Sequence, residues 1–96
     1  MEDREPDRLR LDLYLKRSGL VKRRTLAATL CENDYVSLNG RPAAPGKAVR
    51  TGDRIQVQYA RKKVLVQVTG IPGKGKRTEC YSVLDEQVIE EDLFGE

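Results

Sequence analysis

The first apolar residues of the chain fit two different periods. A strict alternation, typical of a β-strand, joins Leu9, Leu11, Leu13 and Leu15. The same stretch also fits a helix, because Leu11 and Leu15 lie four residues apart and Tyr14 falls on their face. Leucine favours helices, and the stretch holds no β-branched residue. The pattern alone leaves both elements open, tilts toward a helix, and makes Tyr14 a candidate core residue.

Residues 23–33 carry a cleaner helical pattern. Their apolar positions fall on one stripe, made of Leu26, Ala27, Leu30 and Cys31. The Ala27-Ala28 pair adds helix propensity, and Asn33-Asp34 marks the stop. A turn at Ser18-Gly19 separates this segment from the one before it. The two segments predict a pair of short helices joined by a turn.

The remainder reads as short strands separated by turns. Residues 35–38 alternate and are closed by Asn39-Gly40, a strong signal for a tight turn. Two prolines exclude a central strand from residues 41–46, which form a loop leading to residues 47–49. After a turn at 51–53, two longer strands place one apolar face inward, with Ile55, Val57 and Tyr59 on the first and Val64, Val66 and Val68 on the second. Residues 80–84 fit a last strand or a short helix.

Composition sets the class of protein. Ninety-six residues with 39% hydrophobic content make one domain. No apolar run is long enough for a membrane span and no signal-like segment is present, so we expect a cytoplasmic protein. Its two cysteines, Cys31 and Cys80, have no metal or redox spacing; we predict buried free thiols, with a disulfide as the alternative.

Catalytic signals are almost absent. The chain has no His to act as a base, and no Ser or Cys stands beside an evident activator. Carboxylates cluster only near the end, where Glu90, Glu91 and Asp92 would more often be solvated than bind a cation. We therefore predict no enzyme, no cofactor and no metal site.

Charge is distributed unevenly along the chain. Residues 1–7 carry a net charge of −3, residues 8–77 of +13, and residues 78–96 of −7. A basic body between acidic ends is typical of a protein that binds a polyanion, because each neutralised phosphate releases counterions. The alternative, a charged surface that only solvates a small domain, fits a +13 segment poorly. Few aromatic residues favour recognition of folded RNA by shape and phosphate over stacking on single strands.

The densest basic stretch runs from Arg10 to Arg24 and ends where the second helical pattern starts. Free backbone N–H groups at a helix start suit phosphate. Arg24 is the first candidate for a phosphate or ribose contact; a salt bridge to Asp12 is its structural alternative, and Asp12 can orient Arg24 without touching RNA. The full set of candidate RNA-binding residues is Arg10, Asp12, Lys16, Arg17, Lys22, Arg23, Arg24, Arg41 and Lys47.

The order and spacing of a series of residues along the first half of the chain resemble the S4 RNA-binding domain. The resemblance covers residues 10–57 and rests on Arg10-Leu11-Asp12, Leu15, Gly19-Leu20, Arg24, Ala27, Val36, Asn39-Gly40, Gly52-Asp53, Ile55 and Val57. It implies an α+β fold in which an S4-type (αL-like) helix–turn–helix pair packs on a small, mostly antiparallel sheet, and it favours the helix for Leu9–Leu15. We expect a disordered acidic leader at 1–8, the S4-type domain at 9–60, a strand extension packed on it at 61–84, and an acidic tail at 85–96.

Within that family, the run from Lys22 to Ala27, the 63–69 strand and the acidic end resemble the ribosome-associated branch, which contains a bacterial ribosome quality-control factor and a small heat-shock protein. Arg23 stands where many S4 domains have Ser. The branch implies binding to large-subunit ribosomal RNA and peptidyl-tRNA during quality control of stalled nascent chains, with a nascent-chain elongation factor as a further partner. We expect the protein to be a monomer. The alternatives are a heat-shock type role in recycling the large subunit, and a β-grasp or protein-interaction module.

Overall fold

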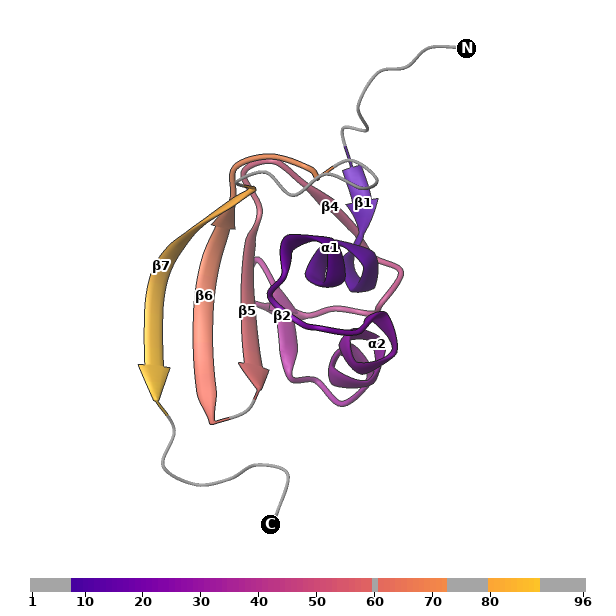
Figure 1. Cartoon of the computed structure of the whole chain (residues 1–96), viewed down its shortest axis with the longest axis vertical. Helices are drawn as coiled ribbons and strands as arrows, with labels where there is room; N and C mark the ends of the chain where they lie inside the picture. Colours follow the sequence, from indigo (N-terminus) through magenta and orange to yellow (C-terminus); the bar gives the residue numbers. More distant parts are fainter. Residues whose placement is uncertain (1–7, 60, 73–79, 89–96) are drawn as a thin grey trace.

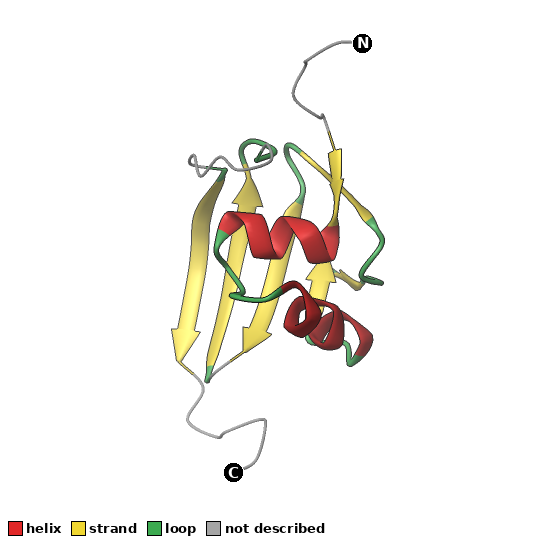
Figure 2. Cartoon of the chain, turned by 45° about the vertical axis from the view of Figure 1, so that its right-hand side comes forward, coloured by secondary structure: helices red, strands yellow, loops and turns green. Residues whose placement is uncertain are grey.

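The computed structural model describes residues 8–59, 61–72 and 80–88. In this part of the chain the elements are β1 (Arg8–Arg10), α1 (Leu11–Ser18), α2 (Arg24–Glu32), β2 (Val36–Leu38), β3 (Arg41–Pro42), β4 (Ala48–Arg50), β5 (Arg54–Tyr59), β6 (Lys62–Val68) and β7 (Tyr81–Val88). The larger sheet has the order β3-β2-β5-β6-β7, and β1 pairs with β4 separately. Every pair is antiparallel. Both helices lie on one face of the larger sheet (Figures 1 and 2), which confirms the predicted α+β fold.

The leucine pattern at the start of the described chain fits a strand and a helix, and the structure contains both, one after the other. Residues 8–10 form a strand in which Leu9 lies opposite Val49, and the helix begins at Leu11. The helical prediction is therefore wrong at residues 9 and 10, because β4 offers them a partner strand. Arg8, predicted to belong to the leader, also lies in β1. The helix ends at Gly19, whose φ of 86° is a left-handed conformation that glycine adopts without strain.

The core lies between the helices and the sheet. From α1 it takes Leu11, Tyr14 and Leu15, and the stripe of α2 contributes Ala27, Leu30 and Cys31. The inward side of β2, β5 and β6 supplies Val36, Leu38, Ile55, Val57, Val66 and Val68. Burying a side chain of this size stabilises the fold by ~1.5–3 kcal/mol. The predicted inward faces are confirmed, although Tyr59 and Val64, at the far end of the strands, are only partly buried.

Tyr14 ties the helices to the sheet extension. Its side chain is fully buried, and its hydroxyl donates to the backbone carbonyl of Cys80 at 2.8 Å. The N–H groups of Thr69 and Gly70 donate to the same carbonyl. Burial in this environment raises the pKa of Tyr14 well above its ordinary value. Tyr14 is thus a core residue, as predicted.

The last described element is a strand, and it is longer than its pattern indicates. β7 pairs with β6 from Tyr81 opposite Val68 to Val88 opposite Lys62. It therefore enters the segment predicted as acidic tail and continues to Val88, because β6 still offers it a partner there. A bulge interrupts the pairing at Leu84, between the pairs Val83–Val66 and Asp85–Leu65. Residues 1–7 and 89–96, predicted as leader and tail, lie outside the described residues.

Turns and cysteines follow the predictions. Asn39 and Gly40, with φ of 54° and 87°, join β2 to β3 in a tight turn. The loop that contains the two prolines adds only the two-residue edge strand β3. Cys31 and Cys80 are buried free thiols. No helix in the described residues is long and apolar enough to cross a membrane.

Candidate nucleic-acid interface

A buried carboxylate forms the centre of the candidate interface. Asp12 lies in the first turn of α1, and 5% of its side chain is exposed. Its Oδ1 accepts a hydrogen bond from Nε of Arg10 at 2.8 Å, and its Oδ2 accepts one from Nε of Arg24 at 3.4 Å. The side chains of the two arginines are 49% and 48% exposed. One buried negative charge therefore holds two positive charges at the surface, one just before α1 and one at the start of α2.

The geometry of these ion pairs leaves most donors of the arginines available. Each guanidinium carries five N–H donors in a planar fork, and Asp12 uses the Nε donor of each. Within the described residues neither Arg10 nor Arg24 makes another side-chain hydrogen bond. Their terminal nitrogens can donate to phosphate oxygens, for which the arginine fork is well shaped. The predicted Asp12–Arg24 salt bridge is present and is compatible with a phosphate contact by Arg24.

A neighbouring loop caps α1 and adds a lysine to the cluster. The N–H of Leu11 donates to the carbonyl of Lys47 at 2.8 Å, and the N–H of Asp12 donates to the carbonyl of Pro45 at 3.0 Å. A Cβ atom at Gly46 would lie 3.7 Å from a terminal nitrogen of Arg10. The loop thus satisfies the first donors of α1, so the start of this helix is closed to phosphate. It also places Lys47 directly beside the Arg10 segment.

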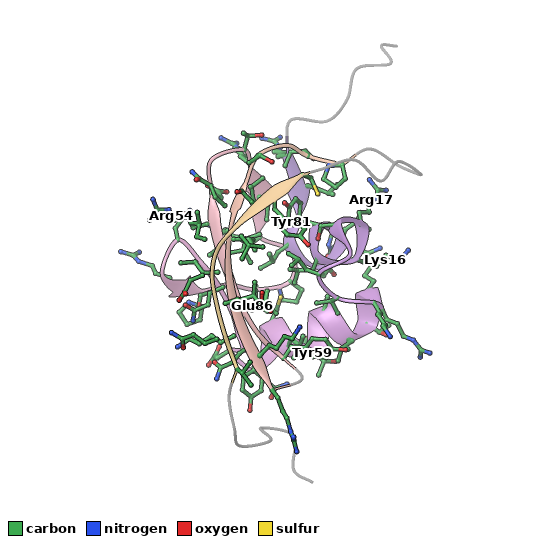
Figure 3. All side chains as sticks on the ribbon, turned by 60° about the vertical axis from the view of Figure 1, so that its left-hand side comes forward. Lys16, Arg17, Arg54, Tyr59, Tyr81 and Glu86 are labelled. Carbon is green, nitrogen blue, oxygen red and sulfur yellow. The ribbon has the colours of Figure 1, made fainter. Side chains whose placement is uncertain are left out.

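The other basic candidates of the helical pair lie along one side of the molecule. Lys16 and Arg17 occupy the last turn of α1, where a positive charge also interacts favourably with the helix dipole. Lys22 and Arg23 are exposed in the linker. Arg23 is the cap residue of α2 and makes no side-chain hydrogen bond to the helix, whose first turn holds no acid. Figure 3 shows Lys16 and Arg17 on the helical side, with Arg54 on the opposite side of the sheet.

Arg41 lies at a hollow that Lys47 also lines, beside the turn after β2. The structure therefore brings Arg10, Asp12 and Arg24 into contact and sets Lys47 beside them, with Arg41 across the hollow. Lys16, Arg17, Lys22 and Arg23 extend the surface from the other end of α1 without joining the ion pairs among the described residues.

Sequence reasoning missed two arginines. Arg8 in β1 lies directly opposite Arg50 in β4, and both are exposed. Like charges directly across a strand pair destabilise it, whereas a bound polyanion would relieve that repulsion. Their position two residues before Arg10 and at the end of β4 makes them an extension of the same basic surface. The charge of the segment pointed to arginines in general, but only the long-range register reveals this pair.

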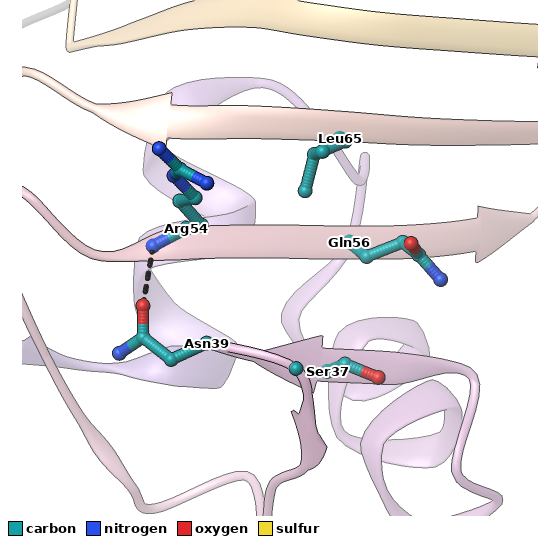
Figure 4. A pocket seen from close by; sticks show the side chains of 6 residues that line it. Ser37, Asn39, Arg54, Gln56 and Leu65 are labelled. Atoms are coloured by element: carbon teal, nitrogen blue, oxygen red, sulfur yellow. Dashed lines mark hydrogen bonds between the residues drawn. The ribbon is translucent and has the colours of Figure 1, made fainter.

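A second hollow lies on the sheet face that the helices leave open. Ser37, Asn39, Arg54, Gln56 and Leu65 line it, and the Asn39 Oδ1 accepts from the backbone N–H of Arg54 at 2.9 Å (Figure 4). It shares no side chain with the Asp12 cluster. Arg54 therefore offers an exposed arginine far from the candidate interface for comparison.

The buried thiols are not nucleophiles. Burial, with the nearby carboxylates of Asp12 and Glu32 adding to it, raises the pKa of Cys31 to about 11. Burial also raises the pKa of Cys80. Both groups are thus protonated thiols at neutral pH, and a thiol is a poor nucleophile. Nor do the described residues contain a group of three or more potential metal ligands.

Known proteins are similar to this chain in sequence and in fold. The model of the S4 domain matches residues 9–55. A protein of Halalkalibacterium halodurans named RQC P-site tRNA stabilizing factor is 37% identical over 84 residues, covering 84% of this chain and 96% of its own. The chain belongs to the S4-domain family of RQC P-site tRNA stabilizing factors. A member of the same name from Bacillus subtilis is 37% identical over 86 residues, covering 86% of this chain and all of its own.

The fold extends the relationship. The trimeric structure of heat shock protein 15 of Vibrio cholerae matches 79% of this chain and 81% of its own, with a TM-score of 0.73 and 25% sequence identity. The match reaches beyond the 9–55 segment of the S4 domain. Both proteins thus share the arrangement of helices and sheet, which confirms the predicted relationship to the two members of the ribosome-associated branch.

Proposed function

We propose that this chain is a non-catalytic RNA-binding protein of the cytoplasm that stabilises peptidyl-tRNA on the large ribosomal subunit during quality control of stalled nascent chains. The observation that carries the proposal is the buried Asp12 with its two half-exposed arginines. The names of its relatives support the tRNA and the quality-control context. The protein acts by holding RNA segments in place, and it makes or breaks no covalent bond.

The charge layout supports RNA as the partner. Arg10, Arg24 and Lys47 form the centre of a surface that continues through the linker at Lys22 and Arg23. Large-subunit ribosomal RNA and the P-site tRNA are the two RNA ligands, and the acting species is a monomer. A nascent-chain elongation factor on the obstructed subunit is its protein partner.

Binding to isolated large subunits tests the proposal. The wild-type chain, an Arg10→Ala/Arg24→Ala double variant and an Arg54→Ala control are sedimented with subunits that carry peptidyl-tRNA and with vacant subunits. We expect wild type and Arg54→Ala to pellet better with peptidyl-tRNA present, and the double variant to lose most binding. Equal pelleting of wild type with both kinds of subunit would refute a role in holding tRNA.

The fold likeness to heat shock protein 15 favours one alternative, recycling of a large subunit without chain extension. The two roles differ in their product. In the branch that this chain resembles, extension means template-free addition of alanine to the stalled chain. Cells that lack the protein therefore lose alanine tails on stalled peptides if it supports extension, and keep them if it only recycles subunits. Restoration of tails by wild type and not by the Arg10→Ala/Arg24→Ala variant would assign the extension role to this surface.

A further inference from the structure

The two edges of the larger sheet are built differently. β3, at one edge, consists of Arg41 and Pro42 alone, whereas β7, at the other edge of the described sheet, has eight residues and no proline. Short length, proline, charge and bulges keep an edge strand from pairing with another chain. β3 combines the first three, while β7 relies on Asp85, Glu86 and the bulge at Leu84. The long edge is therefore the one open to a partner, and its acids restrict which partner that is.

The outer side of β7 offers a row of backbone donors and acceptors. β6 pairs with β7 along its whole length, from Tyr81 to Val88, and this pairing uses one side of the strand. In the part of the chain that the structure describes, no backbone hydrogen bond reaches the other side. Seven of the eight residues are exposed. A strand from another protein can add to the sheet here, which is a common mode of peptide recognition.

Exposed apolar side chains gather on the same strand. Among the described residues the exposed large hydrophobics are Val83, Leu84 and Val88, at 51%, 45% and 75%. Apolar surface gathered in this way marks a place where another molecule packs. Val83 also borders a groove of about 300 Å³ on the helical face of the sheet, and the other apolar residues that line it are Leu20, Val57, Tyr59, Val64 and Tyr81.

The two faces of β7 differ, so an added strand must alternate in character. Val83 and Glu86 line the groove on the helical face, where Glu86 is paired with Lys62 at 3.4 Å. Asp85 lies opposite Leu65, which lines the hollow on the open face, and it makes no ion pair within the described residues. A neighbouring strand would therefore bring apolar side chains beside Val83 and a basic side chain beside Asp85.

Charge selects a basic protein segment over the other occupants. β7 lies within residues 78–96, which carry a net charge of −7 and no lysine or arginine. A second copy would set this acidic strand against itself, and RNA would bring phosphates to the same acids. The cluster around Asp12 lies near β1, on the side of the molecule away from β7 (Figure 1). A basic segment is repelled there and attracted at β7, so both surfaces can be occupied at once.

We propose that the outer side of β7 is a docking site for an extended segment of another protein in which apolar residues alternate with lysine or arginine. The segment adds a strand to the sheet. Its backbone bonds to the open edge supply affinity, and its side chains supply specificity. The apolar ones extend the groove at Val83, and a basic one pairs with Asp85. This inference goes beyond the proposed function and does not depend on RNA binding.

Nuclear magnetic resonance of the full chain, titrated with synthetic peptides as long as β7, tests the docking. The probe is a peptide in which valine alternates with lysine. We expect it to shift the amide signals of Ser82, Val83 and Asp85, and to leave those of Leu38 and Arg41 at the other edge unchanged. A valine–glutamate peptide should leave β7 unchanged. A lysine–serine peptide, basic but not apolar, should bind at least about fivefold more weakly because it buries less apolar surface.

A matched pair of variants separates the contact at Asp85 from net charge. Asp85→Lys should weaken binding of the valine–lysine peptide by roughly 2- to 30-fold, because a repulsion replaces an attraction across the strand pair. Glu32→Lys makes the same change of charge at an exposed residue of α2 and should weaken binding much less. Val83→Ser, which keeps the charge, should weaken binding through the lost apolar contact. It keeps the test valid if Asp85→Lys does not fold.

Several results would overturn the docking site. They are unchanged β7 signals at about 1 mM peptide, equal shifts with the valine–glutamate peptide, and equal effects of Asp85→Lys and Glu32→Lys. Slow hydrogen exchange of all β7 amides in the chain without peptide would also overturn it. Protection that is lost on dilution would make a second copy the occupant, and protection that persists would assign the edge to this chain. Because none of these measurements involves Arg10 or Arg24, failure of the docking leaves the proposed RNA binding untouched.

Discussion

Replacing Arg24 by alanine distinguishes an arginine that grips RNA from one that only stabilises the fold. In the free protein, Arg24 donates to Asp12 at 3.4 Å, and about half of its side chain is exposed. Because the arginine of this pair is half exposed and the distance is long, water screens the attraction, and we take the contribution of about 1 kcal/mol that exposed ion pairs reach at most. Asp12 also keeps its shorter bond to Arg10 in the variant. The free energy of unfolding should therefore fall by no more than about 1 kcal/mol.

Binding should respond much more strongly. A charge-assisted hydrogen bond to phosphate at an interface is worth about 1–3 kcal/mol, which corresponds to a roughly 5- to 150-fold weaker affinity for large subunits. The slope of log K against log salt should fall in magnitude by about 1, because one phosphate contact is lost. Urea unfolding and salt-dependent binding titrations measure the two effects on the same preparation.

The matched control is Arg54→Ala, which removes the same charge from the opposite side of the sheet (Figure 3). Its loss of long-range attraction is screened by salt and should weaken binding only slightly at physiological ionic strength. If Arg24→Ala and Arg54→Ala weakened binding equally, net charge alone would explain the affinity. The assignment of the Asp12 cluster to RNA contact would then be refuted.

Three further changes probe other parts of the molecule. Arg50→Ala should leave the melting temperature unchanged or raise it, because it removes a like charge opposite Arg8. The same variant should bind large subunits more weakly. A lower melting temperature together with normal binding would contradict both expectations. Burial raises the pKa of Cys31 from 9.0 to about 11, so the folded state holds this proton more tightly than the unfolded state. The free energy of unfolding that this group contributes is therefore complete below pH 9 and is lost as the pH rises toward 11. Urea titrations should show a smaller loss of stability over this pH range for Cys31→Ala than for the wild type. Tyr14→Phe should lower the free energy of unfolding by about 0.5–1.5 kcal/mol in the same assay, because two backbone donors still satisfy the carbonyl of Cys80. A loss well above that range would mean that the carbonyl depends on the Tyr14 hydroxyl.

Much of the fold could be predicted from the sequence, because the patterns that indicate its elements lie within short runs of consecutive residues. The stripe of α2 and the alternation in β5 and β6 each report one buried face over consecutive residues, and Asn39-Gly40 encodes its own turn. β1 was not separable from α1, since alternating leucines satisfy both periods and only the pairing of Leu9 with Val49 decides. β7 was read too short because the bulge at Leu84 breaks the alternation of its side chains.

The candidate site was only partly readable for a related reason. Basic residues near the start of α2 pointed to the region where the ion pairs of Asp12 lie, and the Asp12–Arg24 pair was weighed from the sequence as the structural role of Arg24. The stronger bond from Arg10 depends on the change from strand to helix between residues 10 and 11. The Arg8–Arg50 juxtaposition depends on a register across about forty residues. Neither has a local pattern in the sequence.

A buried carboxylate at the centre of the proposed RNA-binding surface has a physical reason. At ~7 Å from a phosphate its repulsion costs about 2.4 kcal/mol at the effective dielectric constant of ~20 that holds near a protein surface, whereas ordering two free arginine side chains on binding costs up to about 4 kcal/mol. By holding both Arg10 and Arg24 in the free protein, Asp12 removes part of that ordering cost for each of them. Asp12→Asn, despite its higher net charge, should therefore bind large subunits more weakly and a simple polyanion such as heparin more tightly. Tighter binding to both would show that charge, and not the fixed arrangement of the arginines, governs recognition.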